Sequence, residues 1–392
     1  MNTKIENKNN LYTVILAIIP LLLLGVVVYA LFSGGPTKMF QSDIPPIENL
    51  HVMRHSLAED TITLDVINAG PDPVTIAQVM VRGAFWYHEI SPKRELFPRE
   101  TARVTIPYPW NIGEPIAILF LTSTGLTFDY EIEVASQTPK PTLKALANFA
   151  MLGVYVGVIP VALGICWFPF LRRLSKKWLD FLLAITVGLL GFLVVDAVIQ
   201  GLEVSAKLPG IFHGQALLIL GLMGAFLILF GIDIEARQKQ HHMGQSFFMA
   251  WLIALGIGLH NLGEGLAIGS AYVLGELSLG ALLVIGFTLH NATEGIAIVA
   301  PILQERVKIR LLLALGILAG GPTIIGCWLG AFTYSLTWSV LFLGIGAGAI
   351  LQVIVIIIRS KSSSSPARFL DILGVILGYL LMYWTGILVG GS

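Results

Sequence analysis

Long apolar stretches recur along most of this chain, and they constrain its fold more than any other feature of the sequence. An α-helix needs about 20 predominantly apolar residues to cross the hydrocarbon core of a bilayer. The chain is 55% hydrophobic and only 12% charged, whereas an ordinary soluble domain carries about 25% charged residues. The pattern therefore predicts an α-helical polytopic membrane protein, with spans at 11–32, 146–170, 179–201, 213–233, 246–272, 278–302, 309–333, 335–358 and 369–389.

The loops between these spans alternate in charge. Nearly all of their Lys and Arg residues lie in "RRLSKK" (172–177), "EARQKQHH" (235–242), "QERVKIR" (304–310) and "RSKSSSSPAR" (359–368). Loops rich in Lys and Arg stay on the cytoplasmic side of a membrane. We therefore expect a multi-pass protein of the cell membrane whose N-terminus is cytoplasmic and whose C-terminus lies outside.

The first 141 residues are expected to form two separate units. Residues 1–35 are interpreted as an N-terminal transmembrane anchor, because the apolar run is longer than the signal-peptide core of about 7–15 residues. A signal peptide remains the alternative, since "VYA" ending at Ala30 resembles a cleavage site.

Apolar and polar residues alternate between 36 and 141, for example in "TITLDVINAG" and "ETARVTIPYP", with turn-forming segments between them. This pattern predicts a small all-β domain, an Ig-like sandwich, on the extracytoplasmic side. Residues 142–392 then form the eight-span membrane domain.

Two of the spans carry the same polar motif, "HNLGEG" starting at His260 and "HNATEG" starting at His290. The His and Glu of each copy are four residues apart, which places them on one helical face. At 1.5 Å per residue, His260 lies ~21 Å along its helix from Ser246, and His290 lies ~18 Å from Ser278. Both histidines are therefore expected near the bilayer midplane, level with each other on two antiparallel neighbours.

The chemistry of the two motifs favours a divalent metal. Imidazole and carboxylate ligands suit ions such as Zn²⁺, Fe²⁺, Mn²⁺ and Co²⁺. A lone carboxylate at the bilayer centre costs roughly 2.5–3.5 kcal/mol, and neither span contains a Lys or Arg to compensate it. The alternative is a pair of protonated carboxyl groups that hydrogen-bond across helices. The candidate metal ligands are His260, Asn261, Glu264, His290, Asn291 and Glu294.

These motifs resemble the paired signatures of the ZIP zinc/iron transporter family, particularly of its bacterial GufA-like branch. The segment "GIGAGAILQVIV" (344–355) is similar to the family's seventh span, and the resemblance covers the eight core spans but not the first 140 residues. It implies a 3+2+3 helix arrangement with inverted symmetry, often as a homodimer. It also implies that the six motif residues form a site for one or two metals.

The sequence departs from the family pattern at two places. Family members often carry Pro before the acidic residue of the motif, where this chain has Gly263 and Thr293. Many members also have a Glu in the sixth span that completes a second metal position. The corresponding segment, "LAGGPTIIGCWLG", has no acid and offers only Thr323. A single main site is therefore expected.

Further polar residues have both a functional and an ordinary interpretation. One face at the outer end of the second core span carries Asp196, Gln200 and Glu203. These residues either form an acidic vestibule that attracts cations or simply belong to a solvated helix end. Gln352 either faces the pathway or packs against a neighbour.

The other histidines are interpreted in the same two ways. His241 and His242 either bind metal near the cytoplasm or are simply solvated. Residues of the outer domain either capture metal or are surface groups: His51, Met53, His55 and His88. Cys166 and Cys327 are interpreted as small buried hydrophobic residues.

The favoured function is transport of a divalent transition metal, Zn²⁺ above all, toward the cytoplasm by alternating access. A membrane metal sensor and a membrane metalloenzyme remain alternatives, although the chain has no HExxH motif. ATP is not an expected partner, since there is no P-loop motif, and the zero net charge gives no case for nucleic acid. The expected partners are metal ions, the lipid bilayer and a second copy of the chain. We expect neither an organic cofactor nor enzymatic activity.

Overall fold

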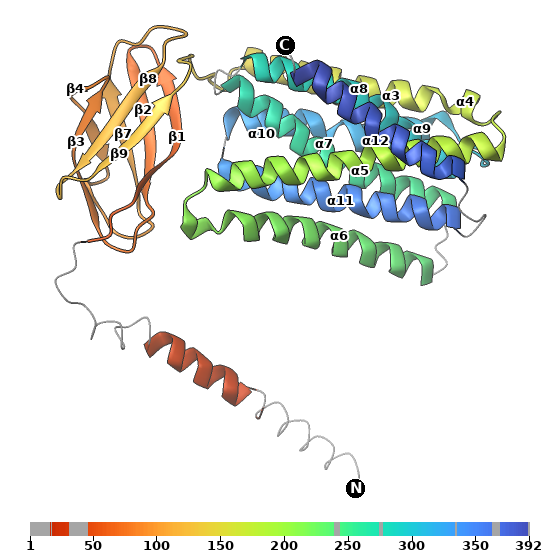
Figure 1. Cartoon of the computed structure of the whole chain (residues 1–392), viewed down its shortest axis with the longest axis horizontal. Helices are drawn as coiled ribbons and strands as arrows, with labels where there is room; N and C mark the ends of the chain where they lie inside the picture. The colour runs from red at the N-terminus through yellow and green to blue at the C-terminus, as the bar shows by residue number, and fades with distance from the viewer. Residues whose placement is uncertain are drawn as a thin grey trace. The chain divides into compact units, whose positions relative to one another are not determined.

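The computed structural model describes residues 16, 18–30, 46–238, 244–273, 277–333, 335–362 and 369–390. Within these ranges it contains a short apolar helix, a β-domain and a bundle of long helices (Figure 1). The apolar helix, Ile18–Ala30, lies inside the first predicted span, and its side chains are exposed. The interpretation of residues 1–35 as a membrane anchor stays a prediction.

The β-domain consists of two antiparallel sheets. One sheet has the order β1-β2-β7-β5, and the other has the order β4-β3-β8-β9 with β6 also paired to β3. The strands are β1 Leu50–Ala58, β2 Thr61–Asn68, β3 Val74–Val81, β4 Ala84–Phe85, β5 Glu89–Ser91, β6 Glu95–Leu96, β7 Thr101–Pro107, β8 Ile116–Thr122 and β9 Thr127–Ile132.

Alternate side chains of both sheets point into one shared core. Ile62 and Leu64 of β2 are fully buried, as are Ile76 and Val79 of β3 in the other sheet, and all belong to a single cluster. This confirms the β-domain that the alternating sequence predicts, and two sheets over one core make it a sandwich. Strand β1, which contains "HVMRH", is an addition to the strands expected from the sequence.

His55 of β1 is held against Tyr130 of β9 in this domain. The Tyr130 hydroxyl and His55 Nδ1 form a hydrogen bond of 2.7 Å. Burial, assisted by the charge of Arg54, lowers the pKa of His55 to about 4, and burial raises the pKa of Tyr130 to about 12. His55 is therefore neutral in the folded domain at neutral pH.

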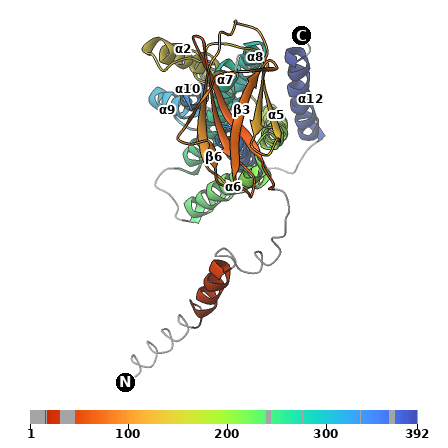
Figure 2. The same cartoon turned by 90° about the vertical axis from the view of Figure 1, so that its left-hand side faces the viewer.

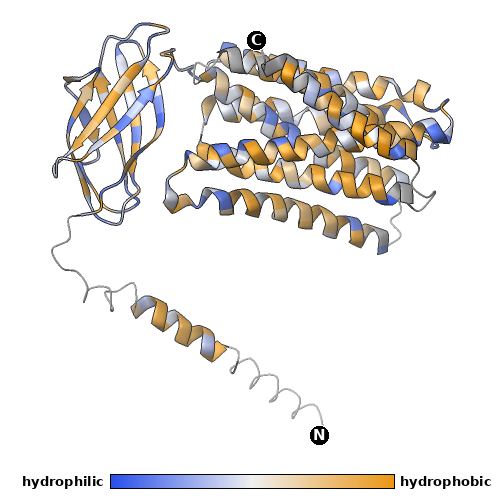
Figure 3. Ribbon diagram, viewed as in Figure 1, coloured by the Kyte–Doolittle hydropathy of each residue, from blue (hydrophilic) through white to orange (hydrophobic). Residues whose placement is uncertain are grey.

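Eight helical segments form the membrane bundle in the described part of the chain. Seven of them are long and apolar enough to span a membrane, and α12 adds the shorter apolar segment Phe369–Trp384. Figure 3 shows that hydrophobic residues dominate these helices. The helices are α2 Leu143–Gly153, α3 Ile159–Cys166, α4 Phe168–Leu171, α5 Lys176–Ala206, α6 Gly214–Gln238, α7 Gln245–Val273, α8 Leu277–Val299, α9 Ile309–Gly320, α10 Pro322–Phe332, α11 Leu336–Ser362 and α12 Phe369–Gly390.

These segments confirm the polytopic helical fold and coincide with the eight predicted core spans. The first of the eight core spans, residues 143–171, is not one regular helix, because a π-helical turn, η2 Val154–Val158, separates α2 from α3. The sixth span is likewise divided into α9 and α10 at Gly321, just before Pro322.

Glycines bring four pairs of helices into close contact. Small residues take this role in membranes because apolar helices gain no hydrophobic free energy by leaving lipid, so that packing must hold them together. A Cβ added at any of these glycines would overlap a backbone carbonyl of the partner helix. They are Gly164 and Gly295 between α3 and α8, Gly188 and Gly378 between α5 and α12, Gly344 and Gly348 of α11 against α6, and Gly265 and Gly326 between α7 and α10.

The two cysteines differ in their surroundings. Cys327 is buried, as expected, but Cys166 is exposed on α3, so the interpretation of both as buried hydrophobic residues is wrong for Cys166. Hydropathy alone does not tell which face of a membrane helix turns outward.

We predict that Gly188→Ala destabilises the bundle, because its Cβ would overlap the Val375 carbonyl. Overpacking of this kind typically costs about 1–3 kcal/mol. Gly191→Ala, three residues along the same helix, is the matched control, because its Cβ would meet no atom within 4 Å. The thermal unfolding midpoint in detergent should fall for Gly188→Ala only. Equal midpoints for the two variants would contradict the packing.

We also predict that the isolated β-domain loses stability as the pH falls from 7 to 4. The unfolded chain binds a proton at His55 near pH 6.5, and the folded domain binds it only near pH 4, so the unfolded state holds more protons between these values. The loss attributable to His55 is at most about 3 kcal/mol. Urea titrations of residues 46–140 at several pH values measure it. The pH dependence should be weaker in His55→Gln, and identical profiles would refute the assignment.

Candidate metal centre

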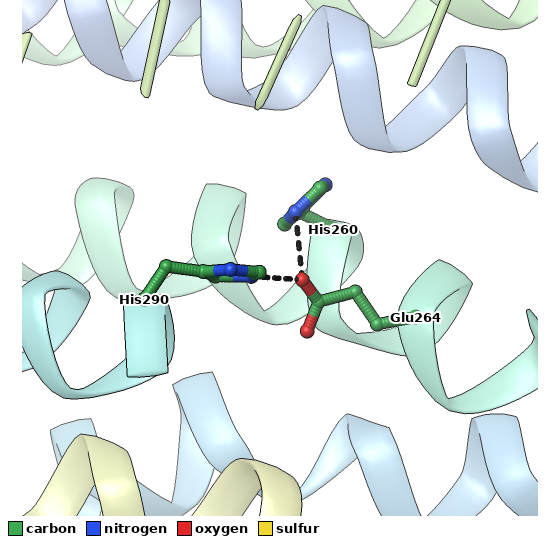
Figure 4. Close-up of side chains that lie close together, drawn as sticks. All are labelled: His260, Glu264 and His290. Carbon is green, nitrogen blue, oxygen red and sulfur yellow. Dashed lines mark hydrogen bonds and ion pairs between the residues drawn. The ribbon is translucent and has the colours of Figure 1, made fainter. Parts of the chain in front are cut away.

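His260, Glu264 and His290 converge in the middle of the bundle. His260 and Glu264 are one turn apart on α7, and His290 extends from the neighbouring helix α8 (Figure 4). Glu264 Oε1 lies 2.5 Å from His290 Nε2 and 3.2 Å from His260 Nε2. One ligand atom from each residue lies within 4.8 Å of the other two. All three side chains are buried. This is the spacing at which a single ion could contact all three.

Asn291 completes the surroundings of the Glu264 carboxylate. Its Nδ2 donates to Glu264 Oε2 at 3.0 Å and to the Val156 carbonyl at 2.9 Å. Val156 lies in the π-helical turn of the first span, where backbone carbonyls lose their regular α-helical partners. The irregular turn thus provides an acceptor that orients Asn291, and Asn291 in turn orients Glu264.

Asn261 has the corresponding position in the other motif copy but a different role. Its Nδ2 donates to the Ala319 carbonyl at 3.1 Å, next to the junction of α9 and α10. The two asparagines therefore connect the ligand-bearing helices to the two irregular spans. Neither carbonyl partner could be identified from the sequence, because backbone acceptors leave no signature in side-chain type.

Glu294 is buried, but it does not join the three-residue group. Neither of its carboxylate oxygens has a hydrogen-bond partner among the described residues, and the same is true of Asn261 Oδ1 and Asn291 Oδ1. A buried carboxylate without compensation is costly, so Glu294 requires a proton or a bound cation. The structure thus gathers three of the six predicted ligands, binds Asn291 to them, and leaves Glu294 and Asn261 with unused oxygen atoms.

A small cavity lies beside the three ligands. Its volume is about 20 Å³, enough for one water-sized occupant. Asp196 and Gln200 of α5 line it together with His260 and Glu264, and Gln200 Nε2 donates to Asp196 Oδ2 at 2.6 Å. Glu203 is exposed and is not part of this lining. Of the two acidic residues on the predicted face, Asp196 therefore lines the cavity and Glu203 does not.

Glycines make room for the site. Gly263 and Gly346 also line the cavity, and a Cβ at Gly346 would lie 3.2 Å from His260 Cα and 3.3 Å from its Nδ1. Gly346 lies in the segment "GIGAGAILQVIV", but residue type and spacing do not single it out as a site residue. Gly263 and Thr293 both lie within continuous helices, α7 and α8.

Two other predicted polar residues are buried on neighbouring helices. Thr323 of α10 packs against Gly157 and Gly265, and its Oγ1 has no hydrogen-bond partner in the described part of the chain. The side-chain amide nitrogen and oxygen of Gln352 on α11 also have no hydrogen-bond partner in the described part of the chain.

The histidines of the β-domain do not gather into a comparable site. Within the described residues, the only group of three His, Cys, Asp or Glu side chains close enough for one ion is the group in the bundle. His55 contacts Tyr130, and His88 Nδ1 lies 3.1 Å from the Trp86 carbonyl. His241 and His242 lie outside the described residues.

Comparison with known proteins gives a family-model match, a match to a curated relative and a weak match to a solved structure. Residues 232–386 match the family model described as "ZIP Zinc transporter". The Zinc transporter ZIPB of Bordetella bronchiseptica is 28% identical over 142 residues, which are 34% of this chain and 46% of the relative. The chain thus spans about half the length of this curated relative.

Among solved structures, the archaellum periplasmic stator protein FlaG from Sulfolobus acidocaldarius is 14% identical and has a TM-score of 0.20. The match covers 22% of this chain and 99% of that chain. At this TM-score the likeness carries no conclusion about the fold.

The matched region contains both copies of the His-Asn-x-x-Glu motif and the helices that bear them. This match agrees with the resemblance seen in the sequence. Residues 232–386 of the membrane bundle are thus similar to the ZIP zinc transporter family.

Proposed function

We propose that this protein transports a divalent transition metal, Zn²⁺ or a related ion such as Fe²⁺, Mn²⁺ or Co²⁺, across the cell membrane toward the cytoplasm. The observation that supports this most directly is the buried group of His260, Glu264 and His290, whose ligand atoms lie within 4.8 Å of one another on two membrane-spanning helices. The family match favours transport over the metalloenzyme and sensor alternatives.

The ligand set suits an ion that binds and leaves. Neutral imidazole and carboxylate prefer borderline divalent ions, and the ion pairs of Glu264 in the described chain are with the two histidines alone. An entering ion replaces the proton that His290 shares with Glu264 Oε1, so that metal binding releases a proton. Glu294, Asn261 and Asn291 offer further oxygens for the same ion or a second one.

The division of the cavity wall supports transport by alternating access. Asp196 and Gly346 line the cavity from α5 and α11, whereas His260 and Glu264 line it from α7. The ligand-bearing helices α7 and α8 are each paired through glycines with α10 and α3, and α5 and α11 are paired with α12 and α6. A shift of one set against the other would open the site first to one side and then to the other.

The remaining parts of the proposal rest on the sequence. They are the GufA-like branch, the division into 1–35, 36–141 and 142–392, the cytoplasmic N-terminus with an outer β-domain and outer C-terminus, and a homodimer. The positively charged loops support the orientation.

We predict that Glu264→Gln abolishes metal uptake into proteoliposomes, because the amide cannot supply the charge that compensates the ion. His290→Ala should have the same effect. Glu203→Gln is the matched control, since it neutralises an exposed carboxylate away from the cavity. Zn²⁺-dependent fluorescence of an enclosed dye measures uptake, and metal analysis of the purified protein measures binding. Wild-type uptake by both site variants would refute the proposed site.

We predict that Asp196→Asn raises the Zn²⁺ concentration needed for half-maximal uptake by about tenfold, because a carboxylate at the cavity concentrates cations there. The maximal rate should change less than this concentration. The same Glu203→Gln variant serves for comparison, and an equal effect of both substitutions would show that only the overall negative charge matters.

A further inference from the structure

An apolar groove lies on the surface of the bundle between the first and sixth spans. Its volume is about 320 Å³, within the range of about 300–1,000 Å³ that small-molecule sites occupy. The walls come from α3 and α4 on one side and α9 on the other, and almost all of the exposed lining is apolar. Figure 2 shows α9 on the opposite flank of the bundle from α12.

Small side chains create this groove. Ala162 and Cys166 of α3 line it together with Gly316 of α9. The larger side chains of Leu313 and Ile317 belong to the α9 wall and are more than half exposed. An unbranched hydrocarbon chain fits such an apolar surface between two helices.

Cations surround one end of the groove. Phe168, Pro169 and Ile309 line this end, and they adjoin exposed basic residues in the sequence, which are Arg172, Arg173, Lys308 and Arg310. None of these four forms an ion pair within the described residues. The single carboxylate of the neighbouring Glu305 does not outweigh these four positive charges, so the cluster has a net positive charge.

One cation–ring contact and one helix N-terminus place positive charge at this end of the groove. The Arg172 guanidinium lies 5.6 Å from the centre of the Phe168 ring, which itself lines the groove. Helix α9 begins at Ile309 with no side-chain cap on its first turn. Uncapped backbone N–H groups at a helix N-terminus favour a phosphate. An apolar groove that ends at a guanidinium, an ammonium and a helix N-terminus without a side-chain cap matches a molecule with a hydrocarbon tail and an anionic head.

We propose that this groove binds one anionic glycerophospholipid, with an acyl chain between α3 and α9 and the phosphate among Arg172, Lys308 and the N-terminus of α9. The loops concerned, 172–177 and 304–310, are the positive loops that the sequence places on the cytoplasmic side, where anionic lipids are enriched. The site is separate from the metal centre, and none of its residues is a metal ligand.

Native mass spectrometry of the full-length protein tests the charge requirement. Phosphatidylglycerol and phosphatidylcholine with identical acyl chains are the probes. The wild type should bind phosphatidylglycerol more tightly. Arg172→Gln and Lys308→Gln should each reduce this affinity by about fivefold. They should reduce phosphatidylcholine binding less, because the choline cation of that head group offsets the charge of its phosphate. Lys177→Gln, which neutralises an exposed cation in the first turn of α5 whose sequence neighbours do not line the groove, should have no effect.

Filling the groove tests the acyl-chain site. Gly316→Leu should reduce the binding of both lipids, whereas Gly224→Leu adds the same side chain to α6 where a Cβ meets nothing within 4 Å and should change neither. Ala162→Leu is a second groove-filling variant if Gly316→Leu fails to fold. Equal binding of the two lipids by the wild type, or unchanged binding in the groove and charge variants, would overturn the proposal.

Two other occupants give different results. Displacement of phosphatidylglycerol by millimolar inorganic phosphate would show that only the head is recognised and would refute the acyl-chain site. A second copy of the chain that packs groove to groove about a two-fold axis would bring two Cys166 residues together, because Cys166 is exposed and lines the groove. An oxidative cross-link that Cys166→Ser abolishes would therefore also overturn the proposal, and its absence is the expected result.

Discussion

The carboxylate of Glu264 is the charge around which the centre of the bundle is arranged. A carboxylate in an apolar interior is costly unless hydrogen-bond donors or cations compensate it. Here two imidazoles approach one oxygen, and Asn291 donates to the other. Asn291 in turn donates to the Val156 carbonyl, so the π-helical turn of the first core span is connected through Asn291 to the candidate metal centre.

Glycine contacts determine where these side chains can lie. Gly265, next to Glu264, packs on the backbone of α10, and Gly295, next to Glu294, packs on the backbone of α3. In a bilayer such close approach replaces the hydrophobic effect as the force that joins helices. The positions of the candidate ligands on α7 and α8 therefore depend on Gly265 and Gly295, although these two glycines pack on α10 and α3 and not on the other motif.

The sequence predicts the parts of this structure that depend on spacing. Helical periodicity and equal depth predict that the His260 and His290 motifs meet, and the length of the apolar runs predicts the spans. The π-helical turn, the role of Gly346 and the exposure of Cys166 depend on which faces meet in three dimensions, and hydropathy does not encode this. Strand β1 is hard to recognise in the sequence because a register shift between Val52 and Arg54 interrupts its alternation.

The two copies of the motif are alike in sequence but not in their surroundings. Glu264 has a histidine of each copy as a partner, whereas both oxygens of Glu294 lack hydrogen bonds within the described residues. The compensated carboxylate keeps its charge when no metal is bound, and the other must hold a proton or a cation. An ion that approaches Glu264 must displace a hydrogen bond, but one that approaches Glu294 need displace only a proton. In the proposed transport function, the two carboxylates would therefore differ in what an incoming ion displaces.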